Sequence, residues 1–254
     1  MLPRPPRRRD HPDDKPHESD EADRPRRPGA HADGEPDGPT ASHSGAMFSA
    51  LFLLVFAIAI IVPWTVADSA RQNTYAEAQA LTEAYWNAGD LPSESSLATR
   101  EALREYTAFV AGREWRLLAR GELAEAGWAR LNALRAELGA LDPKDKTEKE
   151  ALAAVEAQLE QVYAARRQRA VDAQASLPTG VLVLTVLTAG LVLAFPLLSG
   201  ARPRGPVRFT YLLLAGSLAF GVYLAFAINH TFTGPLGVDS SAFESAEREF
   251  QQIP

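Results

Sequence analysis

The chain has 254 residues, 46% of them hydrophobic, and a formal net charge of −6 at pH 7. This negative charge argues against nucleic acid as the main partner. The chain contains no cysteine, which excludes disulfide frameworks, thiolate metal sites and cysteine nucleophiles.

Residues 1–45 are rich in proline and in charges of both signs, and they contain almost no large apolar side chain. Such a segment buries too little apolar surface to offset the conformational entropy lost on folding, so we expect a disordered tail. The cluster Arg7-Arg8-Arg9 leaves open a second role, as an arm that touches anionic lipid or a partner, although nearby acids largely cancel its charge. A third interpretation takes Met47 as the true start.

Three stretches without charge, residues 46–66, 177–198 and 209–229, are long enough to cross a membrane. About 20 apolar residues at a rise of 1.5 Å span a hydrocarbon core of about 30 Å, and helices satisfy their own backbone in lipid. We therefore predict an all-α integral membrane protein with three transmembrane helices in the lipid bilayer. A cleaved signal peptide beginning at Met47 is the alternative for the first stretch, but its apolar run is longer than usual for such a peptide.

The second and third stretches are joined by residues 199–208, which carry two glycines and three arginines. This composition predicts a short turn, so the two helices form a hairpin. Ser176 is expected to cap the second helix, with Pro178 in its first turn, where a missing N–H costs nothing.

Three crossings place the tail and the 199–208 turn on one side of the membrane. Residues 67–176 and 230–254 then lie on the other side. Arginines in the short segments favour a cytoplasmic N-terminus in a multi-pass protein of the cell membrane. The run at 166–169 opposes this orientation, because its arginines lie close to the membrane on the other side.

Residues 67–176 have the pattern of a helical bundle inserted between the first two membrane helices. The first helix is expected to continue past Trp64 and to end at residues 87–89, Asn-Ala-Gly. Apolar residues recur at helical spacing in three stripes: Leu103, Tyr106, Val110 and Leu117; Leu131, Leu134, Leu138 and Leu141; Leu152, Val155, Leu159 and Val162. Narrow stripes of this kind are typical of helix-on-helix seams.

Helix starts are indicated at two places in this region. Ser93 is expected to cap the helix that carries the first stripe. Asp145 and Glu148 are spaced as in a capping box, in which each side chain bonds the backbone at the other position.

The basic run Arg166, Arg167 and Arg169 stands shortly before the second membrane helix. Such a run usually anchors a protein to lipid headgroups. A vestibule that attracts anions is the alternative interpretation.

The segment 230–254 begins as a turn, because Gly234 and the following proline prevent the last helix from continuing. Phe232 is expected to pack back at the membrane interface. Ser240 or Ser241 is expected to cap a short amphipathic helix over 243–250 that lies on the membrane surface.

Sequence signatures of catalysis are missing. Four of the five histidines lie in the tail, and the chain shows no zinc-binding histidine pair, no phosphate-binding glycine loop and no nucleophile elbow. We therefore expect no catalytic residue, no cofactor, no metal site and no enzyme activity.

Several short motifs follow one another in an order that is typical of one family. They are Glu77, Ala78, Leu81 and Tyr85; Tyr106, Val110, Glu114 and Trp115; Arg166, Arg167, Arg169, Leu177 and Pro178; and Phe232, Gly234, Val238 and Phe243. From about Ser44 onward, the chain thus resembles the bestrophin-like domain family of bacterial membrane proteins, long catalogued as a domain of unknown function. Asn229, Thr231 and Ser240 depart from this pattern, since the family has an acid and two prolines there. The chain also lacks the further membrane helix with which the family usually begins.

The resemblance implies a channel-like or transport-related homo-oligomer that conducts a small anion, with Asn229 and Phe232 as candidates to line a pore. It assigns no role to the other matching positions. A membrane-anchored helical scaffold that binds partners without transport is the alternative function.

Overall fold

The computed structural model describes residues 38–202 and 204–253, with side chains from residue 42 onward. From residue 41 onward, the described residues belong to one compact unit, which holds the membrane helices and the bundle. Of the tail predicted over residues 1–45, residues 1–37 lie outside the described residues. From Gly38 the chain is already helical, so the first membrane helix starts earlier than residue 46.

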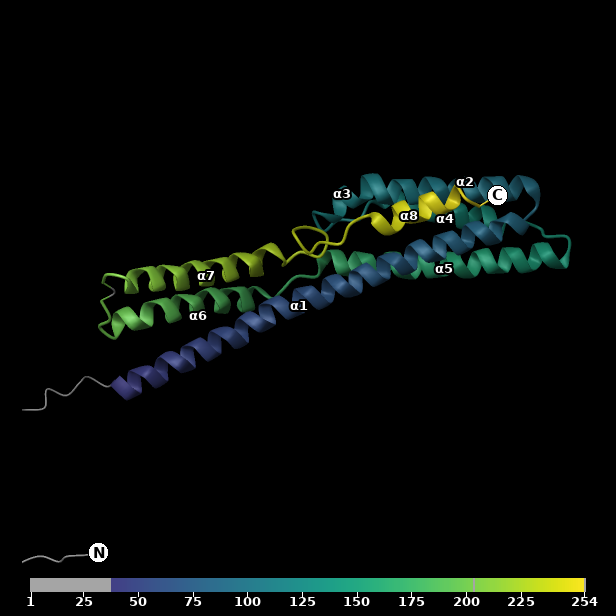
Figure 1. The fold of residues 1–254 in the computed structure, drawn as a ribbon. Helices are drawn as coiled ribbons and strands as arrows, with labels where there is room; N and C mark the ends of the chain where they lie inside the picture. Colours follow the sequence, from purple (N-terminus) through teal and green to yellow (C-terminus); the bar gives the residue numbers. More distant parts are fainter. Residues whose placement is uncertain (1–37, 203, 254) are drawn as a thin grey trace, which may run out of the picture. The chain divides into compact units, whose positions relative to one another are not determined.

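The described part of the chain consists of helices and their connections, without strands (Figure 1). The elements are α1 (Gly38–Asn87), the 3₁₀ turn η1 (Ala88–Asp90), α2 (Ser93–Phe109), the π-helical turn η2 (Val110–Glu114), α3 (Trp115–Leu118), α4 (Glu125–Gly139), α5 (Lys146–Gln174), α6 (Thr179–Leu198), α7 (Val207–Ala227) and α8 (Ser241–Phe250).

Within the described residues, three helices are long and apolar enough to cross a membrane, which confirms the predicted all-α membrane architecture. They are α1, the helical stretch that ends with α6, and α7. The helices α6 and α7 lie side by side as the predicted hairpin (Figure 1). Phe52 of α1, Ala189 of α6 and Leu218 of α7 are buried in one apolar cluster, so the three helices pack on one another.

The helix α1 links the membrane part to the bundle, because it runs for 50 residues without a break. Its first half packs on α6 and α7, and its second half lies among the bundle helices (Figure 1). Pro63 stands inside the helix without ending it. The expected continuation past Trp64 and the expected end at Asn87 are both confirmed.

The bundle consists of the second half of α1 with α2, α4, α5 and α8, which share one apolar core. Nine of the twelve stripe residues are buried, so the predicted seams are confirmed; the half-buried exceptions are Leu117, Leu141 and Leu152. Burial of this kind supplies most of the stability of a helical bundle, because exposed helices of this length are marginal in water.

The predicted helix starts have mixed outcomes. The Asp145 side chain accepts the Glu148 N–H at 2.9 Å, and the Glu148 carboxylate accepts the Lys144 N–H at 2.7 Å, which makes a capping box shifted by one residue. The Ser93 cap is wrong, because the preceding proline takes the cap position and Ser93 is already helical. The Ser176 cap is also wrong: α6 begins at Thr179, with Pro178 just before the helix in extended conformation.

The C-terminal helix α8 was expected on the membrane surface, and this expectation is wrong. Phe243 and Phe250 are 0% and 1% exposed, since both insert into the bundle core. Phe250 stacks on Tyr85 with ring centroids 4.5 Å apart. Ser240 does occupy the cap position, but its hydroxyl donates to the Glu244 carboxylate instead of accepting a backbone N–H.

Candidate functional site

The π-helical turn η2 determines which side chain of its helix points into the bundle. In a regular α-helix, the residue seven positions after Tyr106 would share its face, and that residue is Arg113. The wider π turn accommodates one extra residue, so Glu114 takes this place instead. Glu114 is 0% exposed, whereas Arg113 is exposed.

Glu114 lies at the centre of a buried ion-pair cluster, which comprises Glu77, Tyr106, Glu114, Arg166 and Arg169. Arg166 binds Glu114 in bidentate fashion, with Nη1 donating to Oε1 at 2.7 Å and Nη2 donating to Oε2 at 2.6 Å. Arg169 bridges the two acids, because its Nη2 lies 3.0 Å from Glu114 Oε1 and its Nη1 lies 2.9 Å from Glu77 Oε2. The Tyr106 hydroxyl donates to Glu77 Oε1 at 2.8 Å.

The two acids and two arginines balance each other, so the cluster is neutral as a whole. Such pairs add little net stability compared with apolar residues of similar size, but loss of one partner costs about 3–5 kcal/mol. Within the described residues, no group of three or more His, Cys, Asp or Glu side chains is placed to hold a metal ion. The ion pairs and hydrogen bonds of the cluster hold α1, α2, η2 and α5 together.

Arg166 also contacts α4 and the residue that precedes it. Arg166 Nη2 donates to the Ala124 carbonyl at 3.0 Å, and its guanidinium lies over the Trp128 ring at 4.8 Å. Gly127 makes the close approach feasible, because a Cβ there would lie 2.1 Å from Arg166 Nη2. Sequence reasoning missed Gly127 and Trp128, which carry no periodic signal of their own.

Burial sets the protonation of the cluster. It raises the pKa of the Tyr106 hydroxyl well above its usual value, and the Glu77 carboxylate adds to this rise. Burial also raises the pKa of Glu77, against the opposing effect of Arg169. For Arg166, burial acts to lower the pKa, but the hydrogen bonds and charge interactions with Glu114 and Tyr106 together outweigh it and leave the pKa raised. Tyr106 therefore stays a donor, and Arg166 stays charged.

The interpretation of the basic run as a lipid-headgroup anchor is wrong for two of its three arginines. Arg166 and Arg169 are 0% and 1% exposed and are paired inside the bundle. A solvent-facing anion vestibule is wrong for the same reason. Only Arg167 of the run is exposed. A signal for this burial was present, because the stripe that ends at Val162 continues at helical spacing through Arg166 and Arg169.

Two other matching aromatic residues lie apart from the cluster. Tyr85 is buried two turns further along α1, where Arg100 and Arg104 lie over its ring at 4.9 Å. Trp115 follows Glu114 and packs edge-on against Phe232 and Phe243, at 5.5 and 5.9 Å between centroids. Trp115 therefore connects the bundle to the turn that follows the last membrane helix.

A hydrogen bond joins that turn to the segment that leads into α6. The Asn229 side-chain oxygen accepts the Leu177 N–H at 2.8 Å, so Asn229 ties the turn after α7 to the segment just before α6. Phe232 is 7% exposed within the subunit, which places it in the protein core instead of at the membrane interface and argues against a pore-lining role. Gly234 has a φ of 81°, and a Cβ there would meet the Ala227 carbonyl at 2.3 Å.

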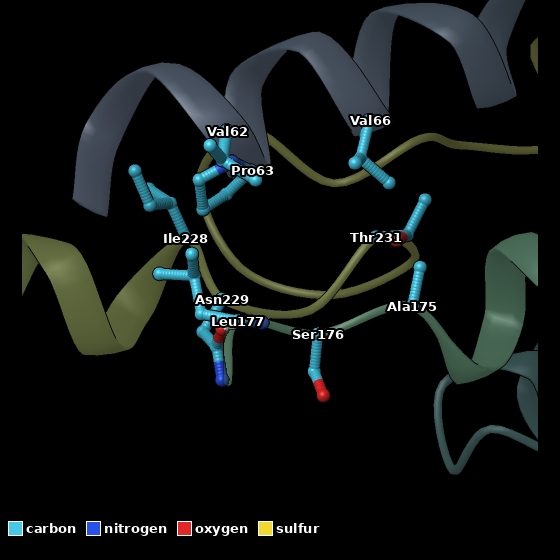
Figure 2. Close-up of a pocket in the computed structure, with 9 residues that line it drawn as sticks. All are labelled: Val62, Pro63, Val66, Ala175, Ser176, Leu177, Ile228, Asn229 and Thr231. Carbon is cyan, nitrogen blue, oxygen red and sulfur yellow. Dashed lines mark hydrogen bonds between the residues drawn. The ribbon is translucent and has the colours of Figure 1, made fainter. Parts of the chain in front are cut away.

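A small pocket of about 90 Å³ lies at this junction between the membrane helices and the bundle. Figure 2 shows Val62, Pro63 and Val66 of α1 facing Ile228 and Thr231 across it. Because Pro63 has no N–H, the backbone of α1 lacks one helical hydrogen bond beside the pocket. The lining is mainly apolar.

Residues 26–243 match the family model of the Bestrophin-like domain. This range includes the whole ion-pair cluster, all three membrane helices and the Asn229–Gly234 turn. No curated protein and no solved structure matches the chain. Because the match covers most of the chain, this integral membrane protein belongs to the bestrophin-like domain family.

Proposed function

We propose that this protein is a channel-like or transport-related homo-oligomer, in which several copies surround a path for a small anion across the cell membrane. The observation that carries the proposal is the exposed apolar surface of the membrane helices. Only 17%, 22% and 17% of their most apolar windows are buried within the subunit. Three helices that bury so little enclose no path alone, so a pore requires a ring of subunits.

The lining of such a path would be apolar and aromatic, because residues 46–66, 177–198 and 209–229 contain no charged side chain. Hydrophobic constrictions of this kind gate by dewetting. On α7, Phe220 and Tyr223 are 64% and 67% exposed and lie next to each other, with centroids 6.5 Å apart. These two rings are better candidates for a pore or subunit contact than the buried Phe232.

A second candidate function is a membrane-anchored scaffold without transport. It is favoured by the position of the buried charges, all of which lie in the bundle outside the three apolar stretches. Ion paths are usually marked by charged or polar groups within the membrane. In both functions the protein is not an enzyme, and the bundle serves as a rigid extramembrane body.

Chloride flux into liposomes tests the two functions against each other. The full chain is purified, its subunit number is measured by native mass spectrometry, and flux is compared with empty liposomes. We expect an oligomer with flux that changes when Phe220 is replaced by alanine. Leu198→Ala, at a position 80% exposed at the end of α6, is the matched control and should leave flux unchanged. A homogeneous, folded protein without flux would favour the scaffold.

A further inference from the structure

A second cavity, of about 380 Å³, opens where the bundle meets the ends of α6 and α7. Its lining comes from residues 118–121 at the end of α3, residues 173–176 at the end of α5, and residues 230–233 after α7. Because α6 begins at Thr179 and α7 ends at Ala227, this cavity lies at the level where the membrane helices leave the lipid. We call it the junction cavity.

One arginine lines the junction cavity, and a second lies close to it in sequence. Arg120 lines it from the turn after α3, and Arg116 lies four residues earlier, inside α3. Both are exposed, and neither makes an ion pair within the described part of the chain. Some other exposed arginines do have an acid within 4 Å, as Arg71 and Arg104 show. Glu122 is the acid nearest to Arg120 in sequence, and the two form no ion pair.

The other polar groups of the junction cavity suit an anion. His230, Ser176 and Thr233 are among its lining residues. Asp172, the acid closest to this lining along α5, does not line the cavity, and its two carboxylate oxygens accept hydrogen bonds from Asn73 and Gln168 at 3.0 and 2.9 Å. A guanidinium with nearby hydroxyls is the usual chemistry for binding a phosphate group.

The apolar neighbourhood identifies the source of this phosphate as a lipid. The junction cavity shares Ala175, Ser176 and Thr231 with the small apolar pocket of Figure 2. A polar site with an arginine therefore adjoins an apolar site lined by Val62 and Ile228. An amphipathic ligand fits this combination better than a free ion.

We propose that the junction cavity binds the phosphate headgroup of an anionic phospholipid, with Arg120 as the principal contact and the small apolar pocket holding the beginning of an acyl chain. Arg116 contributes long-range attraction. The site depends only on the position of the protein in a membrane, so it holds for a channel and for a scaffold alike.

Native mass spectrometry of the full-length protein in mild detergent tests this site. The protein is titrated with phosphatidylglycerol, with phosphatidylcholine of the same acyl chains, and with inorganic phosphate. We expect phosphatidylglycerol to bind several-fold more tightly than phosphatidylcholine. Arg120→Gln should lower the affinity for phosphatidylglycerol about fivefold, as expected for one basic residue near a headgroup. Lys149→Gln, which removes an exposed charge at the start of α5, is the control and should bind like the wild type.

Three results would overturn the proposal. The first is equal affinity of the wild type for the anionic and zwitterionic lipids. The second is a wild-type affinity in Arg120→Gln. The third is displacement of phosphatidylglycerol by inorganic phosphate at the same concentration, which would make the cavity a site for a soluble anion. Arg120 and Arg116 are exposed, so their glutamine variants are expected to fold, and unchanged thermal unfolding without lipid would verify this.

Discussion

At the scale of single residues, Gly127 has the clearest testable consequence. A methyl group at this position would overlap the guanidinium of Arg166, which is buried and fixed by Glu114. We expect Gly127→Ala to destabilise the protein by about 1–3 kcal/mol, the usual cost of overpacking. Thermal unfolding in detergent measures this effect. Gly139→Ala is the matched control, since a Cβ there meets nothing within 4 Å. Equal unfolding temperatures for the two variants would contradict the proposed packing of Arg166.

Tyr106 gives a prediction about pH. Its pKa is raised in the folded state, so above pH 10 or so the folded protein holds a proton that the unfolded chain releases. Stability from this group is therefore fully present below that pH and is lost as the pH rises further. We expect the unfolding temperature of the wild type to fall more steeply between about pH 9 and 11 than that of Tyr106→Phe, which cannot ionise. If the unfolding temperature fell with pH equally in the two proteins, this would contradict burial of the Tyr106 hydroxyl.

The residue scale also shows why sequence reasoning misread the basic run. Arg166 and Arg169 were matched to the family, but their partners Glu114 and Glu77 lie 52 and 92 positions earlier in the chain. A charge seen only beside a membrane helix is interpreted through its neighbours in sequence, and these favour lipid. Their positions on the buried stripe would have indicated the bundle interior. Gly127 and Trp128 became visible only with the fold.

At the scale of elements, the π turn η2 is the feature that sequence periodicity could not supply. Its extra residue rotates Glu114 inward, and a regular helix over the same residues would have placed Arg113 there. The stripes on α4 and α5, by contrast, follow the regular α-helical period and were predicted correctly. The helix α8 was predicted as an element but assigned to the wrong surface, because an amphipathic face fits either lipid or a bundle core.

Deletion of Gly112 tests the role of η2. Removal of this exposed residue should convert the π turn to a regular α-helix, in which Glu114 stands seven positions after Tyr106 and still faces Arg166. We expect this variant to fold with nearly wild-type stability. Deletion of Ala102, inside the regular part of α2, should instead rotate one side of the helix by about 100° and prevent normal folding. Gel filtration and thermal unfolding distinguish the two, and equal damage from both deletions would contradict the proposed register.

At the scale of the whole molecule, the uncharged stretches were enough to predict the three membrane helices, and the spacing of apolar residues was enough to predict the helical character of residues 67–176. Lipid imposes strict length and polarity requirements, so the apolar stretches leave few alternatives. The junction between the two parts was not predictable in the same way. It depends on contacts such as Asn229 with Leu177 and Trp115 with Phe232, which join segments 52 or more residues apart.

The packing of α8 gives a last prediction, about topology. Because α8 shares the bundle core, the C-terminal segment must lie on the same side of the membrane as α5, and the turn after α6 must lie on the opposite side. The chain has no cysteine, so single introduced cysteines are clean probes. We expect Glu150→Cys and Glu249→Cys to react from one side with a membrane-impermeant thiol reagent, and Arg204→Cys to react from the other.

The same labelling decides the orientation. Arginines in the short turn favour its cytoplasmic location, so in intact cells the probes at 150 and 249 should react while the probe at 204 is protected. All three sites are exposed, and protection therefore reports the membrane and not burial. Reaction of 204 together with 249 would rule out three crossings. Reaction of 204 alone would keep the three crossings but place the bundle, the junction cavity and its arginines in the cytoplasm, where anionic lipid gives the inner leaflet its negative surface potential.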